Sequence, residues 1–548
     1  MRNWATATNS KVQSGVEPLK DLYLHSAASN FIPRHGSPGQ LVVVGLIALF
    51  VLLTALLSYI NLFIIQGEKR IAEISTRTMF GATKANIARL FFIETAIVFS
   101  ISAVLAFLVT YLSLPYYAAL LISGVELSDL LSGWGISSVL IVLSILLILT
   151  SGYPVLYLTR MKYTQGLRGK FSSTGKNNWF SSASVFVQFM VTSFFISCVF
   201  IIILQIKYMH KVPMGFDADQ VTVVSDCSMP VARKYESVKS ELLKLPFVTA
   251  VCGGEHFMGG GCSGQYIRNT TEGENNNKAI NEYREKPGFS EIMRLQLLDG
   301  RFFRESMADS LAVVLNESAM TLLGLKPLAG QTVLYNDKRM EVIGVVKDFY
   351  YLSNPGEAIQ PLVIANCFRG TPNIYIRSRI SLNENQKLQL KSIFQRFDEN
   401  FIFNPQLIRD VFRGMYRQEY RLAIMVTIGS AEVAIISLIS LLALTILKIS
   451  RRTKEIGIRK VLGSSVGQII FRLLREILIL VTLAIILASV ASSVVMNLWL
   501  RGYYKHLSLD WGYFVYSAIF AFAIAAAATI GQSWHAAARN PVDAVKCE

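Results

Sequence analysis

The sequence predicts an α-helical membrane protein with about seven transmembrane helices and one large α+β extracytoplasmic domain. Three observations lead to this prediction. The chain of 548 residues is 52% hydrophobic and only 16% charged, whereas soluble domains carry about 25% charged residues. It contains several long apolar runs. A single long polar stretch, residues 207–420, separates two groups of these runs.

The apolar runs define the predicted membrane spans. A transmembrane helix needs about 20 consecutive, mostly apolar residues, and seven runs in the chain meet this requirement. They are residues 41–66, 91–115, 134–158, 183–206, 421–449, 471–499 and 512–535.

The loops between these runs differ in charge. Three short loops are rich in Lys and Arg, whereas residues 116–133 contain neither. Because loops rich in Lys and Arg stay in the cytoplasm, we expect residues 207–420 to lie outside the cytoplasm and the C-terminus to lie inside. The net charge of +16 then reflects membrane topology. We therefore expect the lipid bilayer, and no nucleic acid, as a partner.

The polar stretch mixes strand patterns with helix patterns, which predicts an α+β domain. Asn336 and Asp337 suit the turn of a β-hairpin. The predicted strands are residues 220–226, 311–318, 332–351 and 373–379, and the predicted helices are residues 231–245 and 383–397.

Cysteines in the polar stretch leave two interpretations open. Cys252 and Cys262 flank the glycine-rich run "CGGEHFMGGGC", and they either form a local disulfide in an oxidising compartment or remain free thiols. With His256 they are also conceivable metal ligands, but their spacing fits no common zinc pattern. We expect no metal and interpret the run as a mobile loop or a substrate-contacting tip. The four cysteines of the stretch are Cys227, Cys252, Cys262 and Cys367.

No catalytic or cofactor-binding motif is found, so we expect no enzymatic activity in this chain. The run "GKFSSTGKN" at residues 169–177 is the closest to a P-loop, but its glycines are one residue too far apart and it ends in Asn177. His256, Asp226 and Ser228 are conceivable members of a hydrolase site, but no nucleophile motif surrounds them.

A charged stretch occurs twice, 382 residues apart: "KRIAEISTRTMFGAT" from Lys69 to Thr83 and "RRTKEIGIRKVLGSS" from Arg451 to Ser465. Each copy follows one predicted span and precedes two more, so the chain contains two related blocks of three spans. The matched pairs are Arg70 and Arg452, Glu73 and Glu455, Ile74 and Ile456, Arg77 and Arg459, Gly81 and Gly463, and Glu94 and Glu476.

The two copies predict the same local structure. Glu455 and Arg459 are spaced i, i+4, which supports a helix, and Gly463 suits a helix C-cap. We expect a short amphipathic helix at the inner membrane interface, then a turn, then a helix that re-enters the membrane. Anchoring to lipid headgroups is the simpler alternative, but it requires only charge and gives no reason for matched acids and glycines.

These residues resemble the membrane subunits of ABC transporters of the FtsX/MacB-like permease family. The pattern R-x-x-E-I-x-x-R-x-x-x-G is similar to the family's cytoplasmic coupling segment, which docks on the ATPase subunit. Residues 342–364, "VIGVVKDFYYLSNPGEAIQPLVI", resemble its periplasmic core domain, and residues 538–546, "ARNPVDAVK", resemble its C-terminal tail. The first copy of the coupling segment departs from the second, with Thr78 and Phe80 in place of Lys460 and Leu462.

The resemblance implies an ATP-driven permease of the inner membrane. It would couple ATP hydrolysis by a dimer of separate ABC ATP-binding subunits to movements of a periplasmic domain, for export or efflux. The alternatives are a mechanotransmission or signalling module without solute transport, and a lipoprotein-release system. A periplasmic adaptor or an outer-membrane channel is a further candidate partner. The six matched pairs would be the ATPase-coupling residues.

The resemblance and the repeat predict the domain organisation. Because the second block is preceded by a span and an external domain, we expect the chain to be an N-terminally truncated form of a longer protein. The predicted parts are a remnant of a first periplasmic domain (1–40), a three-helix block (41–160) with coupling segment 67–90, a cytoplasmic linker (161–182), the helix that opens the second repeat (183–206), the periplasmic core domain (207–420), a second three-helix block (421–540) with coupling segment 449–475, and a cytoplasmic tail (541–548).

Glu432 is the one clear carboxylate inside a predicted span. A carrier driven by protons or ions should show several ionisable groups in its spans, so a separate ATPase fits better as the energy source. We expect Glu432 to line the interior of the helix bundle, to lie near the outer interface, or to be a tolerated polar contact.

Overall fold

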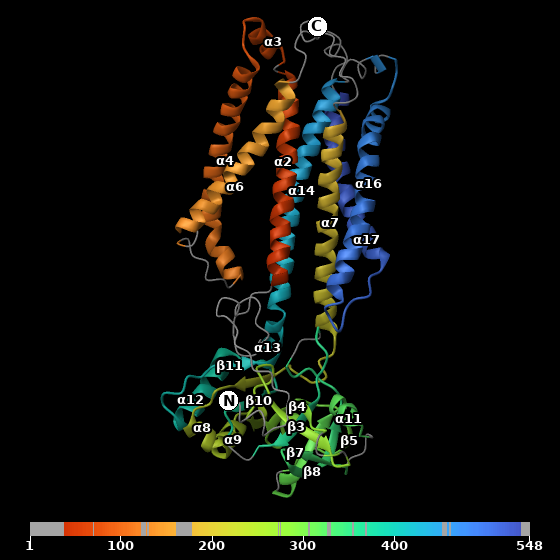
Figure 1. The fold of residues 1–548 in the computed structure, drawn as a ribbon. Helices are drawn as coiled ribbons and strands as arrows, with labels where there is room; N and C mark the ends of the chain where they lie inside the picture. Colours follow the sequence, from red (N-terminus) through yellow and green to blue (C-terminus); the bar gives the residue numbers. More distant parts are fainter. Residues whose placement is uncertain are drawn as a thin grey trace. The chain divides into compact units, whose positions relative to one another are not determined.

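The computed structural model divides into two compact units (Figure 1). One, the β-rich unit, contains Gln205–Gln418 and Trp499–Leu507. The other, the helical unit, contains the membrane-spanning helices. The residues that the structure describes are 38–69, 71–121, 128, 131–159, 178–271, 273, 276–304, 307–325, 330–352, 356–367, 370–451, 458–459 and 462–538.

Seven of the described helices are long and apolar enough to cross a membrane, which confirms the predicted number of spans. Helices α7 and α14 extend past their apolar runs, so each contributes residues to both units. The seven are α2 (Pro38–Lys69), α4 (Lys84–Leu121), α6 (Gly133–Thr159), α7 (Asn178–Lys211), α14 (Arg417–Arg451), α16 (Val466–Leu500) and α17 (Trp511–Ala538).

The helical unit contains one large buried cluster, where α7 packs against α14, α16 and α17. Phe189 of α7 lies in this cluster with Leu441 of α14, Val481 of α16 and Ala521 of α17. In the other half of the unit, α4 and α2 each pack on α6.

Hydrogen bonds between neutral side chains join α2, α7 and α14. Gln188 of α7 donates to the Ser58 hydroxyl of α2 at 3.1 Å, and the hydroxyls of Thr192 and Ser437 lie 2.8 Å apart. Asn61 of α2 donates to Ser440 of α14 at 3.4 Å. Inside a bilayer, hydrophobic burial does not favour one pair of apolar helices over another, so polar contacts of this kind help to decide which helices associate.

Glu432 lies near the middle of the α14 span, and its side chain is exposed in the described structure. The sequence could not reveal this exposure, because the side of α14 that faces its neighbours depends on packing.

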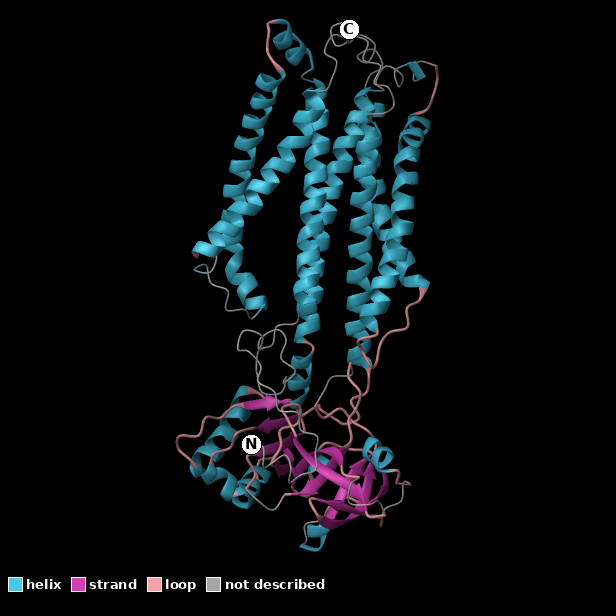
Figure 2. Ribbon diagram, viewed as in Figure 1, coloured by secondary structure: helices cyan, strands magenta, loops and turns pink. Residues whose placement is uncertain are grey.

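The β-rich unit holds every described strand (Figure 2). Four strands form an open antiparallel sheet in the order β11-β1-β10-β2, and six close into a barrel in the order β4-β3-β7-β8-β6-β9, where β9 pairs back to β4. Strand β5 pairs with β8. The strands are β1 (Val221–Val224), β2 (Val248–Gly254), β3 (Ser263–Asn269), β4 (Lys278–Glu285), β5 (Leu297–Gly300), β6 (Ala312–Asn316), β7 (Thr332–Tyr335), β8 (Lys338–Val346), β9 (Leu362–Asn366), β10 (Asn373–Ser378) and β11 (Pro405–Leu407).

Helices cover the sheet and the barrel. Val238 of α9 and Phe394 of α12 are buried against Val251 and Ile376 of the open sheet, whereas Met320 of α11 packs on the barrel strands. The remaining short helices of the unit lie between strands or before α14. The helices of this unit are α8 (Met229–Arg233), α9 (Tyr235–Leu243), α10 (Phe289–Ile292), η2 (Met307–Leu311), α11 (Glu317–Leu323), α12 (Glu384–Phe397) and α13 (Ile408–Met415).

Local sequence signals account for some of these elements. Asn336 and Asp337 have φ of 48° and 59° and form the predicted β7–β8 turn, since both residue types tolerate the left-handed region. Helix α12 starts with a capping box between Asn383 and Gln386. The predicted helix 231–245 is instead two helices that meet at Lys234. Strands β2, β3, β4, β5, β9 and β11 were not predicted.

The glycine-rich run is also partly a strand, because Cys252 to Gly254 complete β2. All the cysteines that the structure describes are free thiols, so Cys252 and Cys262 form no disulfide in it. Burial raises the pKa of the Cys262 thiol to about 11 and that of Cys227 to about 12, which keeps both thiols protonated and unreactive.

The open sheet meets the barrel at one residue pair, Gly254 of β2 and Glu285 of β4. A side chain at Gly254 would overlap the Glu285 carboxyl, so glycine here makes room for the acid. Both oxygens of Glu285 are buried and have no hydrogen-bond partner among the described residues. Burial raises the pKa of Glu285 well above its usual value, and the nearby backbone amide of His256 lowers it by less.

Replacing Glu285 by Gln should stabilise the β-rich unit at alkaline pH. Folded wild-type protein keeps a proton on Glu285 that the unfolded chain releases, so the free energy of unfolding falls as pH rises above the ordinary glutamate pKa. Glutamine has no proton to release. We expect similar melting temperatures for the two proteins at about pH 4 and a value about 2–4 °C higher for the variant at about pH 8.

The measurement is thermal unfolding of the purified full chain, followed by its intrinsic fluorescence. A variant that loses stability with pH as steeply as the wild type would contradict the assignment of this dependence to Glu285.

Candidate functional site

The first copy of the repeated stretch forms a helix and a tight turn. Helix α3 (Ile71–Met79) carries an ion pair of 3.0 Å between Glu73 and Arg77, as the i, i+4 spacing predicts. The Ala82 amide donates to the Arg77 carbonyl at 3.0 Å, and the Gly81 amide donates to the Thr78 carbonyl at 3.1 Å. With φ of +91° at Gly81, these bonds make a Schellman C-cap.

The second copy repeats this turn at the matched residues. The Ser464 amide donates to the Arg459 carbonyl at 3.0 Å, and φ of Gly463 is +90°. Both values agree with those at Ala82 and Gly81, which lie 382 positions earlier.

The helix that follows each turn begins in the same way. Thr83 accepts a hydrogen bond from the Asn86 amide at 3.3 Å, and Ser465 accepts one from the Gln468 amide at 3.3 Å. Each hydroxyl therefore acts as an N-cap. We call residues 71–87 the first turn segment and residues 458–469, as far as they are described, the second turn segment.

Each turn segment exposes a large apolar side chain directly before its glycine. Phe80 is 89% exposed and Leu462 is 79% exposed. Sequence reasoning interpreted these residues as a difference between the copies. In the structure they occupy the same position in the turn, and both are highly exposed. Comparing the two copies by residue class, large and apolar, would have shown from the sequence that these positions match.

The first turn segment is held against the spans by a small apolar cluster. Ile74 of α3 is buried with Ile87 and Phe91 of α4, and Phe63 of α2 packs on them. The rings of Phe63 and Phe91 meet edge to face at 5.6 Å. A displacement of α3 therefore also moves α2 and α4, since a packed cluster transmits strain.

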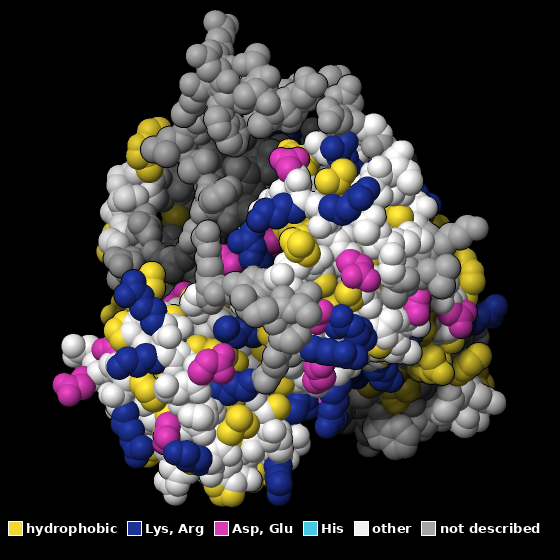
Figure 3. Space-filling view, turned by 90° about the horizontal axis from the view of Figure 1, so that it is seen from below, with side chains coloured by type: hydrophobic (Ala, Val, Ile, Leu, Met, Phe, Trp, Pro, Cys, Tyr) yellow, Lys and Arg dark blue, Asp and Glu magenta, His cyan; other side chains and the backbone are white. Residues whose placement is uncertain are grey.

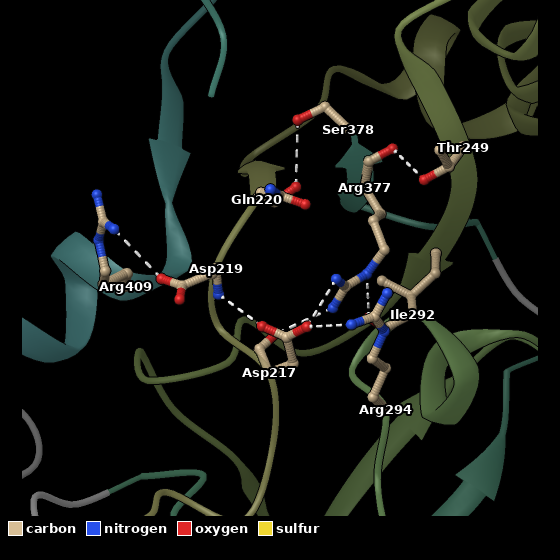
Figure 4. A network of polar contacts seen from close by, with 9 residues as sticks. All are labelled: Asp217, Asp219, Gln220, Thr249, Ile292, Arg294, Arg377, Ser378 and Arg409. Atoms are coloured by element: carbon tan, nitrogen blue, oxygen red, sulfur yellow. Dashed lines mark hydrogen bonds and ion pairs between the residues drawn. The ribbon is translucent and has the colours of Figure 1, made fainter. Parts of the chain in front are cut away.

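A second polar constellation lies in the β-rich unit, where the chain leaves α7 and approaches α14 (Figure 4). Arg377 of β10 lies at its centre, with a side chain only 8% exposed. Its guanidinium donates to the Ile292 carbonyl at 2.7 Å, to the Asp217 carboxylate at 3.0 Å and to the Asp217 carbonyl at 3.0 Å. Arg294 pairs with the same carboxylate at 2.9 Å.

The constellation extends to α13, the helix before α14. Arg409 of α13 donates to Asp219 at 3.2 Å, and the Asp219 amide donates to Asp217 at 3.1 Å. The rings of Phe216 and Phe412 are 5.1 Å apart. We call this network, together with its aromatic contact, the junction, because it ties the segment after α7 to α13.

The loop between α16 and α17 is tied to α7 within the same unit. The side-chain amide of Gln205 in α7 makes two hydrogen bonds to this loop. Its nitrogen donates to the Lys505 carbonyl at 3.1 Å, and its oxygen accepts from the Leu507 backbone amide at 2.8 Å. The Tyr504 amide donates to the Gly356 carbonyl at 2.6 Å. Within the β-rich unit, hydrogen bonds therefore join the end of α7 to the loop after α16, and this loop to residue 356.

His256 has no free nitrogen for catalysis or for a metal. Its Nδ1 accepts from the Arg284 amide at 2.9 Å, which leaves the proton on Nε2, and Nε2 lies 2.8 Å from the Ser263 hydroxyl. A protonated Nε2 donates to serine and does not act as its base. Neither Asp226 nor Ser228 is bonded to His256, and no three His, Cys, Asp or Glu side chains among the described residues gather as a metal site.

Charged residues do not separate by sign on the face of the β-rich unit seen in Figure 3. Lys and Arg side chains are interspersed there with Asp and Glu. This mixture is unlike the continuous basic surface with which proteins bind nucleic acid.

Two family models match the sequence. The FtsX-like permease C-terminal model matches residues 45–163 and 427–541, and the MacB-like periplasmic core domain model matches residues 196–387. Together they match well over half of the chain. The two FtsX matches begin 382 residues apart, in the register of the repeated stretch.

This chain belongs to the FtsX/MacB-like permease family. An FtsX/MacB-like permease is a multi-pass membrane protein with an extracytoplasmic domain, which corresponds here to the β-rich unit. Permeases of the family work with ABC ATPase subunits and are not themselves catalytic.

The similarity of the chain to solved structures is lower than its similarity to the family models. The periplasmic region of MacB from Actinobacillus actinomycetemcomitans is 16% identical, and the match covers 38% of this chain and 97% of that one, with a TM-score of 0.28. The extracellular domain of the noncanonic ABC-type transporter YknZ from Gram-positive bacteria is 14% identical, with 34% and 98% covered and a TM-score of 0.25. No curated protein matches the sequence.

The predicted coupling residues of this permease are only partly visible. Glu73, Ile74, Arg77 and Gly81 come together in the first turn segment, whereas Glu94 lies farther along α4 and is half-buried. In the second copy, Arg459 and Gly463 are described, and Glu476 lies in α16 without a described side chain. Arg70, Arg452, Glu455 and Ile456 lie outside the described residues.

Alanine at Gly463 should loosen the second turn segment of the permease. A residue with a Cβ is strained by about 1–2 kcal/mol in the left-handed region, so the Ser464 amide should exchange its hydrogen about 5 to 30 times faster. Hydrogen exchange by mass spectrometry on the chain in lipid nanodiscs measures this. Gly467→Ala is the matched control, because that glycine has an ordinary φ and open space around it. Equal exchange in both variants would contradict the role of Gly463.

The junction should depend on Arg377 far more than on Arg409. Arg377→Gln leaves Asp217 without its buried partner, and we expect the free energy of unfolding to fall by about 3 kcal/mol. Arg409→Gln breaks an exposed pair and should cost about 0–1 kcal/mol. Urea unfolding of the detergent-purified full chain measures both free energies. Similar decreases in the two variants would contradict the greater importance of Arg377.

Proposed function

We propose that this chain is the membrane subunit of an ATP-driven ABC transporter located in the inner (cytoplasmic) membrane. A dimer of separate ATPase subunits docks on the two turn segments from the cytoplasmic side, where the C-terminus also lies. ATP hydrolysis then moves the extracytoplasmic domain, and this movement drives the export of a substrate. The observation that carries the proposal is the matching turn geometry of two segments that each expose an apolar side chain, as far as the second segment is described.

Paired docking surfaces suit a dimeric partner. Each copy of an ATPase dimer presents the same surface, so the membrane subunit must offer it two similar contacts. The turn segments share a Schellman turn, an N-cap and an exposed apolar residue at matched positions. An exposed Phe80 or Leu462 in water is unfavourable, and its burial in a partner would contribute about 1.5–3 kcal/mol.

The structure also offers a route for the movement. The first turn segment packs on α2 and α4 through Ile74, and α2 is hydrogen-bonded to α7 and α14. Helices α7 and α14 continue into the extracytoplasmic domain, where the junction ties the segment after α7 to α13. In this proposal, residues 41–160 and 421–540 act as two membrane blocks and residues 207–420 act as the moving domain.

Replacing Leu462 by Ser should weaken coupling to the ATPase. Loss of the buried apolar contact should reduce the stimulation of ATP hydrolysis by the permease about tenfold to a hundredfold, and Phe80→Ser should act in the same direction. The measurement is the ATPase activity of the reconstituted complex in lipid vesicles, with Leu311→Ser as the control, because Leu311 is an exposed apolar residue of the β-rich unit. Stimulation equal to that of the wild type in both serine variants would contradict docking at these positions.

The double substitution Glu455→Lys with Arg459→Glu gives an independent test of the second segment. It preserves the i, i+4 ion pair in reversed order but changes the charges offered to a partner. We expect normal membrane insertion and loss of transport-coupled ATP hydrolysis. Unchanged coupling would reject the segment as an ATPase contact, and coupling to an outside protein without any transported substrate would favour the signalling alternative.

A further inference from the structure

Three short stretches of the β-rich unit carry cations and no acids where membrane spans end. They are residues 205–213 around the end of α7, residues 411–418 from α13 into α14, and residues 499–507 from the end of α16 into the following loop. Each stretch contains two Lys or Arg residues, four positions apart, and no Asp or Glu. The pairs are Lys207 and Lys211, Arg413 and Arg417, and Arg501 and Lys505.

Contacts inside the β-rich unit bring the three stretches together. The rings of His210, near the end of α7, and Tyr416, between α13 and α14, are 4.8 Å apart. The side chain of Gln205 in α7 is hydrogen-bonded to Lys505 and Leu507 of the loop after α16. Cations from three distant parts of the sequence therefore gather near the end of α7. We call these six residues the outer basic cluster.

The cations of the outer basic cluster are available to a partner. All six occupy exposed positions. Arg413 forms a long ion pair with Asp410 at 3.8 Å, whereas the other five form no ion pair with any residue that the structure describes. Because a stable protein normally balances such a concentration of charge with nearby acids, the five cations indicate an anion outside the chain.

Membrane topology does not account for these cations. Lys and Arg beside a span favour the cytoplasmic side, but the β-rich unit is the extracytoplasmic domain. Residues 116–133, which the alternation of the spans puts on the same side, contain neither Lys nor Arg. Helix dipoles favour cations at the C-terminal ends of α7 and α16, but they give no reason for Arg417, which begins α14, or for Lys505.

The position along the spans indicates which anion the cluster meets. Lys211 is the last residue of the α7 span, Arg417 lies two residues before the α14 span, and Arg501 directly follows the α16 span. The ends of spans lie in the headgroup region of a bilayer, where every phospholipid has a phosphate group. Tyr504, between Arg501 and Lys505, is 63% exposed, as is typical of tyrosines at a membrane interface.

We propose that the outer basic cluster binds the phosphate groups of anionic phospholipids in the outer leaflet of the membrane. The lysines attract a phosphate as point charges, and each arginine can donate two hydrogen bonds to it. A zwitterionic lipid brings its own cation close to the cluster, so a headgroup with a net negative charge is preferred. Lipid is favoured over an acidic protein because the cations lie at the ends of spans, where lipid is already present. The inference is independent of the docking of an ATPase.

A photoreactive phenylalanine derivative at Tyr504 of the full chain tests the proposal, since it samples this surface and not the basic cytoplasmic loops. The chain is placed in nanodiscs of equal parts phosphatidylcholine and phosphatidylglycerol, and mass spectrometry identifies the cross-linked lipid. We expect about fivefold more cross-linking to phosphatidylglycerol than to phosphatidylcholine, because several cations contribute to the attraction.

Replacing the five cations that lack a described partner should make the two yields equal. The substitutions are Lys207→Gln, Lys211→Gln, Arg417→Gln, Arg501→Gln and Lys505→Gln. A matched control removes the same charge at exposed positions of the β-rich unit outside the three stretches, and it should keep the preference. Its substitutions are Arg233→Gln, Lys338→Gln, Arg339→Gln, Lys347→Gln and Lys391→Gln. If the first variant does not fold, Arg501→Gln with Lys505→Gln, both in an exposed loop, should reduce the preference by about half.

Three results would overturn the proposal. The first is equal cross-linking to the two lipids when the cluster is intact. The second is an unchanged preference in the folded variants of the cluster. The third, in native membranes, is cross-linking of the Tyr504 position to an acidic protein segment in place of lipid.

Discussion

The structure depends above all on the rule that a chain inside a bilayer must satisfy its own backbone hydrogen bonds. The rule restricts the spans to helices, and it leaves specialised geometry to the helix ends, where water or a partner is available. The turns at Gly81 and Gly463 follow from it. Each closes one helix with a Schellman cap and starts the next with a hydroxyl cap, so backbone amides on both sides of each turn are hydrogen-bonded.

Within the membrane, neutral polar side chains then decide which helices meet. Ser58, Gln188 and Ser437 are not needed for insertion, and their hydrogen bonds select the partner and the rotation of α2, α7 and α14. The close approach of Ile47 to Gly429 places matched residues of the two halves in contact. The repeat is therefore a relation in space as well as in sequence.

In the β-rich unit, buried ionisable groups are stabilised in two different ways. Arg377 is buried with a carboxylate and two carbonyl groups around it, so its charge is matched by acceptors. Glu285 is buried without such partners and is stabilised as the neutral acid instead. The first arrangement belongs to the network that ties the segment after α7 to α13, and the second lies where the open sheet meets the barrel.

The sequence by itself determined the number of spans, the repeat, the family and the residues of both turns, because length, apolar runs, charge spacing and glycine positions are local properties. It also predicted the hairpin at Asn336 and the start of α12. Only the tertiary structure decided the pairing of β4 with β9, the burial of Arg377 and Glu285, the shared exposure of Phe80 and Leu462, and the outward direction of Glu432. These depend on contacts between residues far apart in the chain, and no local pattern specifies which side of a helix or strand a neighbour will cover.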